Sequence, residues 1–338
     1  MRLLDVTLQR ITESYQIIED DVHSRWKNLY LGMSELGSLE SLVVKYARAI
    51  GEPYPLLPKK VLFILSTAHG VVNKLDNDET YEIKNRREFY SYVKRLGLSS
   101  QTTIELIKNS DVKICPEEFQ LGVTADFTEG AAMNEETAVS AIEFGIKIAE
   151  SWIDKGYQLL LLGNISKGAT FVATTFLAGL YQIPATAIYD IKRNHHCMGI
   201  YQNIDLIQQA LDVNQVTMHN GIDALCKVGG KDIGILAGII LGAASRHAAV
   251  IVDGISGIAA TALAKSLSSN SIQSVFASAP LDIKQEDSIL GELCLHTPIV
   301  LNTRLEIGES ALMQAKILEI GLQIYQECAT KEEMGRKG

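Results

Sequence analysis

The amino-acid sequence predicts an α/β fold: a parallel, Rossmann-like sheet flanked by helices, with a small helical subdomain formed from both termini. Three observations lead to this prediction. Short, continuous apolar runs recur along the chain, segments of helical period separate them, and both ends carry helical patterns without strands between them. Repeated strand–helix–strand units of this kind build a parallel sheet around one core.

The apolar runs are the expected strands, because each is short and closed by a polar or glycine turn. A continuous apolar run, as opposed to an alternating one, indicates a strand that is buried on both faces of a parallel sheet. The expected strands lie at 61–65, 159–162, 248–254, 274–280 and 297–302.

The clearest helix is predicted over 133–156, where Asn134 is a plausible N-cap and Gly156 ends the pattern. A second helix is predicted over 232–247, and its small residues should let it pack close to the sheet. Amphipathic helices are also expected near both termini. We therefore divide the chain into a helical subdomain of residues 1–50 and 308–330 and an α/β nucleotide-binding-like domain of residues 51–307.

Composition limits the partners of this chain. Its 338 residues are 47% hydrophobic, which is enough to bury a full core. The formal net charge of −9 argues against a nucleic-acid or anionic-membrane surface, since both need a basic field. The N-terminus lacks an apolar signal core, and no uncharged apolar run reaches about 18 residues. A cytoplasmic location is therefore expected.

The cysteines do not predict a metal centre or a disulfide framework. There are five, they are far apart, and no CxxC pair occurs. His195 and His196 have no second ligand pair at zinc spacing. We expect free thiols in a reducing compartment, no bound metal and no cofactor.

Polar residues follow each expected strand, and ligands of open parallel sheets lie beyond these carboxyl ends. One crevice could thus hold an imidazole, several carboxylates and a polar loop, although the same residue types also cap helices in any α/β protein. These residues are Ser66, Thr67, His69, the loop Gly163–Thr170, Asp253, Ser256, Ser278, Arg304, Glu306 and Glu309.

The stretch 159–170, "LLLLGNISKGAT", has the form of a phosphate-binding turn. A buried strand runs into a glycine and a polar loop, and a helix-like run follows. Backbone N–H groups at a helix N-terminus bind phosphate in such turns. This loop has only two glycines and no acid, which weakens the prediction.

From about Leu31 to Cys328 the chain resembles the nicotinate mononucleotide:5,6-dimethylbenzimidazole phosphoribosyltransferases of cobamide biosynthesis. The resemblance covers nearly the whole chain in order. It is carried by "LGSLESLVVKYARAIGEPYPLLPKKVLFIL", "AHGVV", "MNEETAVSAIEFGIKIA", "VGGKDIGILAGIILGAASRHAAVIVDGISGIAATAL" and "TRLEIGESALMQAKIL".

The resemblance implies a dimer with a parallel-sheet domain and a small helical domain. It also implies a reaction in which nicotinate leaves the ribose C1′ of nicotinate mononucleotide and an aromatic base attacks to give an α-ribotide. Glycine-rich backbone should hold the phosphate. A carboxylate should take the proton of the base, and negative charge should favour the cationic sugar of the transition state.

The chain departs from the family at its phosphate-binding segments. The family loop "GEMGIGNTT" aligns with 163–171, which puts Asn164 in place of the acid, Ser166 in place of a glycine and Ala169 in place of the asparagine. The family segment "GRGTG" falls near "DIKRN" at 190–194, and its following lysine falls near Asn203. A side chain at a former glycine position crowds the approach of a phosphate.

The catalytic glutamate of the family motif "RLGEGTG" aligns with Ile307, and Glu306 and Glu309 stand one and two residues away. Neighbouring residues point in other directions, so neither replaces the carboxylate simply. The family's "GDHGV" has become 67–71, "TAHGV", and has lost its aspartate; the front element "KPPGSLG" has become "GMSELGS".

Losses at several independent segments, with core glycines kept, point to a preserved fold whose site has eroded. Phenol- and cresol-transferring members of the family are heterodimers of two homologous chains, one of them active, and this chain resembles the inactive partner. We expect no catalytic residue here and vestigial substrate-binding roles at the crevice. The vestigial residues are His69, Gly163, Asn164, Ser166, Lys167, Gly168, Thr170, Asp253 and Ser278.

Two alternatives stay open at this point. One is a divergent but active transferase, in which Glu306 or Glu309 takes the base role and Lys167 binds phosphate. The other is a nucleotide- or base-sensing protein on the same scaffold. The partner is either an active homologue, in a heterodimer, or a second copy of this chain.

Overall fold

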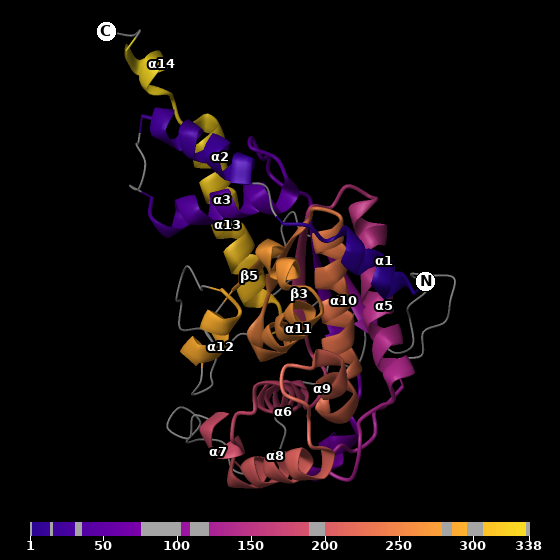
Figure 1. Cartoon of the computed structure of the whole chain (residues 1–338). Coiled ribbons are helices and arrows are strands. Elements are labelled where there is room, and N and C mark those ends of the chain that lie inside the picture. The colour runs from indigo at the N-terminus through magenta and orange to yellow at the C-terminus, as the bar shows by residue number, and fades with distance from the viewer. Residues whose placement is uncertain are drawn as a thin grey trace.

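A computed structural model of the chain gives the arrangement of most of its elements (Figure 1). It describes residues 2–13, 16–30, 36–75, 103–108, 122–188, 200–278, 286–295 and 307–335. The expected strand at 297–302 lies outside these ranges.

Five parallel strands form one sheet in the order β2-β1-β3-β4-β5. The strands are β1 (Lys60–Ser66), β2 (Thr103–Lys108), β3 (Leu159–Asn164), β4 (Ala249–Val252) and β5 (Val275–Ala277). The parallel sheet flanked by helices is confirmed, and four of the strands coincide with apolar runs in the sequence. The edge strand β2 was not predicted, because its sequence "TIELIK" alternates and has no continuous apolar run.

Helices follow the strands and cover the sheet (Figure 1). Those of the α/β part are α5 (Glu135–Ile153), α6 (Ala169–Tyr181), α7 (Ala185–Ile188), α8 (Ile200–Asn214), α9 (Gly221–Val228), α10 (Lys231–Ser245), α11 (Gly254–Leu267) and α12 (Glu286–Glu292), with the 3-10 helices η1 (Gly70–Lys74) and η2 (Ser269–Ser274). The terminal helices are α1 (Leu3–Arg10), α2 (Gln16–Asn28), α3 (Ser38–Ile50), α13 (Glu309–Glu327) and α14 (Lys331–Gly335).

Strands β1, β3, β4 and β5 are buried on both faces, as the continuous apolar runs predicted. Along β1, Val61, Phe63 and Leu65 join a cluster with the helices on one face. Leu62 and Ile64 join a second cluster on the other face. This alternation follows from the two-residue period of a strand, and each buried apolar side chain contributes about 2 kcal/mol of transfer free energy.

The second cluster joins the sheet to helices from both ends of the chain. It contains buried side chains of α2, α3 and α13. Trp26 of α2 packs on Tyr325 of α13 with ring centroids 5.1 Å apart, and Arg25 Nε donates to the Tyr325 carbonyl oxygen at 2.9 Å. Figure 1 shows α13 (yellow) running from the sheet up to α2 and α3. In contrast, α1 packs on α5, where the Leu4 N–H donates to Glu143 Oε1 at 3.0 Å.

The longest helix contact joins α5 and α10. Asn134 caps α5 as predicted, since its side chain accepts from the Thr137 N–H at 2.8 Å. Gly234, Gly238 and Gly242 of α10 lie against α5, and the helix also contacts β3 and β4 of the sheet. A methyl group at Gly238 would lie 1.9 Å from the Ile142 carbonyl oxygen, which leaves no room for any side chain. Glycine here sets the distance between the two helices.

We predict that Gly238→Ala lowers the free energy of unfolding by about 3 kcal/mol or more, because backbone cannot move aside for the added methyl group without separating the helices. The matched control is Gly291→Ala in α12, where nothing lies within 4 Å of the added methyl group. That change should be neutral or stabilise by up to about 1 kcal/mol. Urea denaturation checks both variants; equal stability of the two would contradict the close packing.

Candidate functional site at the carboxyl ends of the strands

The carboxyl ends of β1, β3, β4 and β5 meet at one edge of the sheet. Leu65 of β1 is in register with Asn164 of β3, and Val252 of β4 is in register with Ala277 of β5. The residues that follow these ends therefore become neighbours. Of the candidates, only Arg304 and Glu306 lie outside the described residues.

Asn164 is held by a buried polar network. Its Nδ2 donates to Asp232 Oδ2 at 2.7 Å, and its Oδ1 accepts from the Ser166 N–H at 2.9 Å. The Ser166 hydroxyl in turn accepts from the Thr67 N–H at 2.8 Å. These bonds tie the end of β3 to the end of β1 and to the start of α10. Both sides of the Asn164 amide are thus bound within the protein.

Asp232 and His69 form the charged part of this network. His69 Nε2 lies 3.3 Å from Asp232 Oδ2, and both side chains are fully buried. Burial alone would raise the pKa of Asp232, but the charge of His69 and the hydrogen bond from Asn164 hold it below its usual value. A methyl group at Gly230 would lie 2.6 Å from His69 Cε1, so the glycine makes room for the ring.

Asp232 was not predicted from the sequence. It lies in the first turn of α10, where its Oδ1 also accepts from the Ile233 N–H at 2.9 Å. The glycine pair before it, Gly229–Gly230, was the only signal of a close approach at this point.

The loop between β3 and α6 uses its own N–H groups internally. The Ile165 N–H donates to the Leu65 carbonyl oxygen at 2.8 Å, and the Ala169 N–H donates to the Ser166 carbonyl oxygen at 3.1 Å. With the Ser166 N–H bound to Asn164, three donors of the loop are committed. Gly168 has a φ of 76°, in the left-handed region that favours glycine, while Lys167 and Thr170 are exposed.

Ile307 lies against the end of β3. A methyl group at Gly163 would come within 1.9 Å of the Ile307 carbonyl oxygen, so the two backbones are in direct contact. The Ile307 side chain is partly buried and packs on the cluster formed by α2, α3, α13 and the sheet. Ile307 and Gly308 therefore border the residues gathered at the strand ends, the group that is called the crevice below.

Asp253 fixes this segment in place. Its Oδ2 accepts from the N–H groups of Gly308 and Ser310 at 2.9 and 3.1 Å, and its Oδ1 accepts from the Ser278 hydroxyl at 2.8 Å. Burial raises the pKa of Asp253 to about 7, the Ser278 hydrogen bond opposes this, and the charge of Glu309 adds to it. One carboxyl group thus links β4, β5 and the start of α13.

Glu309 caps the segment that leads into α13. Its Oε2 accepts from the Ile307 N–H at 2.9 Å, and the residue is only 3% exposed. It lies in the first turn of α13, where an acid complements the helix dipole.

Asn203 lies on α8, whereas the segment 190–194 falls outside the described residues. Cys226, Cys294 and Cys328 are free thiols. Within the described part of the chain, no group of three His, Cys, Asp or Glu side chains could hold a metal ion. None of the helices in that part has both the length and the apolar character needed to span a bilayer.

Comparison with known proteins places the chain in a family. A protein-family model described as "Phosphoribosyltransferase" matches residues 11–335, so the chain belongs to this phosphoribosyltransferase family. The nicotinate-nucleotide–dimethylbenzimidazole phosphoribosyltransferase of Halalkalibacterium halodurans is 29% identical over 339 residues, covering 97% of this chain and 93% of the relative. The enzyme of the same name from Desulforamulus reducens is 29% identical and covers 99% of both chains.

The fold agrees with this assignment. The crystal structure of CobT from Thermus thermophilus superposes with a TM-score of 0.79, covering 94% of this chain and 98% of that chain, at 22% identity. The parallel sheet and its flanking helices are therefore the fold of this enzyme class.

We predict that stability falls as pH rises from about 4 to about 7. The pKa of Asp253 is about 7 in the folded chain and near its ordinary value of 3.8 when unfolded. Within this window the unfolded chain loses a proton that the folded chain keeps, which costs up to about 1.4 kcal/mol per pH unit. Asp253→Asn keeps one of the two acceptor oxygens and removes the titration, so the pH slope of its stability should be flatter by up to that amount.

Urea denaturation at pH 4.5, 5.5 and 6.5 measures these slopes. Asp223→Asn is the control. Partial burial raises the pKa of Asp223, but hydrogen bonds from Thr217 and Lys227 outweigh this and hold the pKa below its ordinary value. Asp223 therefore does not titrate within the window. Parallel slopes for the parent chain and Asp253→Asn would contradict the raised pKa.

Proposed function

We propose that this chain is the non-catalytic subunit of a phosphoribosyltransferase that activates the lower ligand of a cobamide, paired with an active homologue. The relatives' names support the reaction, transfer of phosphoribose from a nicotinate nucleotide to dimethylbenzimidazole. The sequence resemblance adds a phenol as the other possible base. The residues at the strand ends that differ from the family's motifs are the reason for proposing a non-catalytic role.

The observation that carries this proposal is Ile307. The family resemblance puts it at the position of the family's glutamate, and in the structure its backbone contacts Gly163 at the end of β3. A carboxylate at this place could take the proton of the attacking base. An isoleucine there has no group that accepts a proton, and its side chain joins an apolar cluster.

The neighbouring acid offers no simple replacement. Glu309 is buried and accepts from the Ile307 N–H, which directs its carboxylate to the backbone of its own segment. A general base must reach the proton that it removes, within about 3 Å or through one water. Glu306, the other neighbouring acid, lies outside the described residues.

The state of the loop between β3 and α6 also favours the proposal. A phosphate cradle needs several N–H groups directed at the ligand. Here the N–H groups of Ile165, Ser166 and Ala169 donate within the protein. Asn164, which the resemblance puts in place of the family's acid, donates from its Nδ2 to Asp232.

Two further assignments belong to the same proposal. The crevice residues keep vestigial substrate-binding roles, and the chain divides into residues 51–307 and a helical unit of residues 1–50 and 308–330. The vestigial residues are His69, Gly163, Asn164, Ser166, Lys167, Gly168, Thr170, Asp253 and Ser278.

One observation favours a second candidate, a divergent active transferase. Asp253 and Glu309 interact at the strand ends, and the pKa of Asp253 is raised by burial and by the charge of Glu309. Carboxyl groups with perturbed pKa values concentrate at active sites. The Asp253 carboxyl, however, already accepts three hydrogen bonds, which gives it a structural role.

We predict that this chain, co-expressed with a homologue that has glutamate at the position of Ile307, elutes with it as one heterodimer. The reason is that the family resemblance implies a dimer, and a homologous chain can supply the matching half of a pseudo-symmetric interface. Size-exclusion chromatography with light scattering and a different tag on each chain measures the composition. Two separate homodimers would contradict the partner role.

A further inference from the structure

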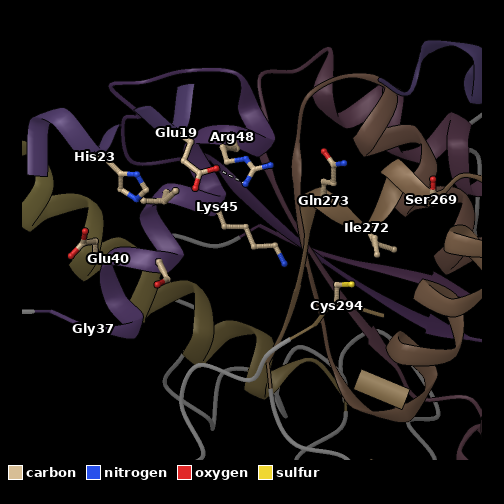
Figure 2. A pocket seen from close by; sticks show the side chains of 12 residues that line it. Glu19, His23, Gly37, Glu40, Lys45, Arg48, Ser269, Ile272, Gln273 and Cys294 are labelled. Carbon is tan, nitrogen blue, oxygen red and sulfur yellow. Dashed lines mark hydrogen bonds and ion pairs between the residues drawn. The ribbon is translucent and has the colours of Figure 1, made fainter. Parts of the chain in front are cut away.

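A cavity of about 800 Å³ lies away from the crevice described above. It is bounded by α2 and α3 on one side and by η2 and Cys294 on the other (Figure 2). The segment η2 leads into the first residue of β5, so the cavity lies at the amino end of that strand. The crevice lies at the carboxyl ends, so the two are distinct.

Lys45 supplies the charge of this cavity. Figure 2 shows its side chain extending from α3 into the space between the helices and η2. Its Nζ donates to the Val275 carbonyl oxygen and lies 4.9 Å from the centre of the Phe276 ring. Within the described part of the chain, no carboxylate pairs with this ammonium group. Arg48, one turn further along α3, is instead neutralised by Glu19 at 2.7 Å.

Lys45 is partly buried between α3 and the start of β5. Burial, helped by the charge of Arg48, lowers its pKa to about 8, although Cys294 partly opposes the shift. Among the described residues, the partners of this partly buried ammonium group are a carbonyl oxygen and a ring face, so an anion would add an oppositely charged partner. The remaining acid of the lining, Glu40, lies in the first turn of α3.

The rest of the lining suits the body of a small organic molecule. Ser41, Ser269 and Gln273 contribute polar groups, while Val44 and Ile272 contribute apolar surface. A volume of this size and a mixed lining are typical of ligand sites. We propose that the cavity binds a small organic anion whose carboxylate or phosphate group pairs with Lys45 and whose body lies against Val44 and Ile272.

The test is calorimetric titration of the full chain at pH 7 with benzoate and, separately, with inorganic phosphate. Benzoate binding identifies a carboxylate site, and phosphate binding identifies a phosphate site. Lys45→Met should weaken the bound probe at least tenfold. The control is Lys155→Met, which removes an exposed lysine that also lies over a ring, 4.4 Å from the centre of Trp152, outside the cavity.

A second measurement does not depend on how well the Lys45→Met variant folds. The affinity of the parent chain should fall as pH rises through about 8, where Lys45 loses its proton. Among the described residues, the other titratable or charged groups that line the cavity are Glu19, His23, Glu40, Arg48 and Cys294. Cys294→Ser removes the thiol and should leave the decline in place.

Three results would overturn the proposal. They are failure of both probes to bind at millimolar concentration, equal affinity in the parent chain and Lys45→Met, and an affinity that stays constant between pH 7 and pH 9.5. None of these depends on whether the chain has transferase activity.

Discussion

The Asp253 carboxyl group holds together the part of the molecule on which the site depends. It ends β4, accepts from Ser278 after β5, and accepts from two N–H groups at the start of α13. The start of α13 therefore lies on the strand ends, although it is more than fifty residues away in sequence. This contact brings Ile307 against Gly163 at the border of the crevice. Hydrogen bonds to a buried carboxyl group are among the stronger ones in proteins, and losing them leaves the group unsatisfied.

The crevice is organised by interactions of the protein with itself. A buried charge is tolerated only when it is paired and hydrogen-bonded, and Asp232 meets this condition through His69, Asn164 and the Ile233 N–H. Asn164 completes the network where the family has an acid. A glutamate at that place would bring a second negative charge next to Asp232. The network thus suits the asparagine, in agreement with the proposed non-catalytic role.

The strands could be predicted from sequence where a run was apolar on both faces, as at Leu159–Leu162. The edge strand β2 could not, because its sequence, "TIELIK", contains no continuous apolar run. His69, Asn164 and Asp253 could be predicted as crevice residues because ligands of parallel sheets lie beyond the carboxyl ends of the strands. The residues to which they bind could not be predicted. Asp232 and Ser310 reach them from other elements, and no local pattern encodes such contacts. The packing of α10 on α5 illustrates the same point. The small residues of α10 predicted a close approach, but the sequence did not identify α5 as the helix that they contact.

Turnover by the isolated chain tests the central claim most directly. Homogeneous protein is assayed with nicotinate mononucleotide and either dimethylbenzimidazole or phenol, and the release of nicotinate is measured. Loss of one main stabilising group commonly lowers the rate by 10²–10³-fold, so the combined losses at Asn164, Ser166 and Ile307 predict no detectable product. The same chain in complex with an intact homologue should show ordinary turnover from the partner's site. Turnover of about 1 per second or more by the isolated chain would contradict the account.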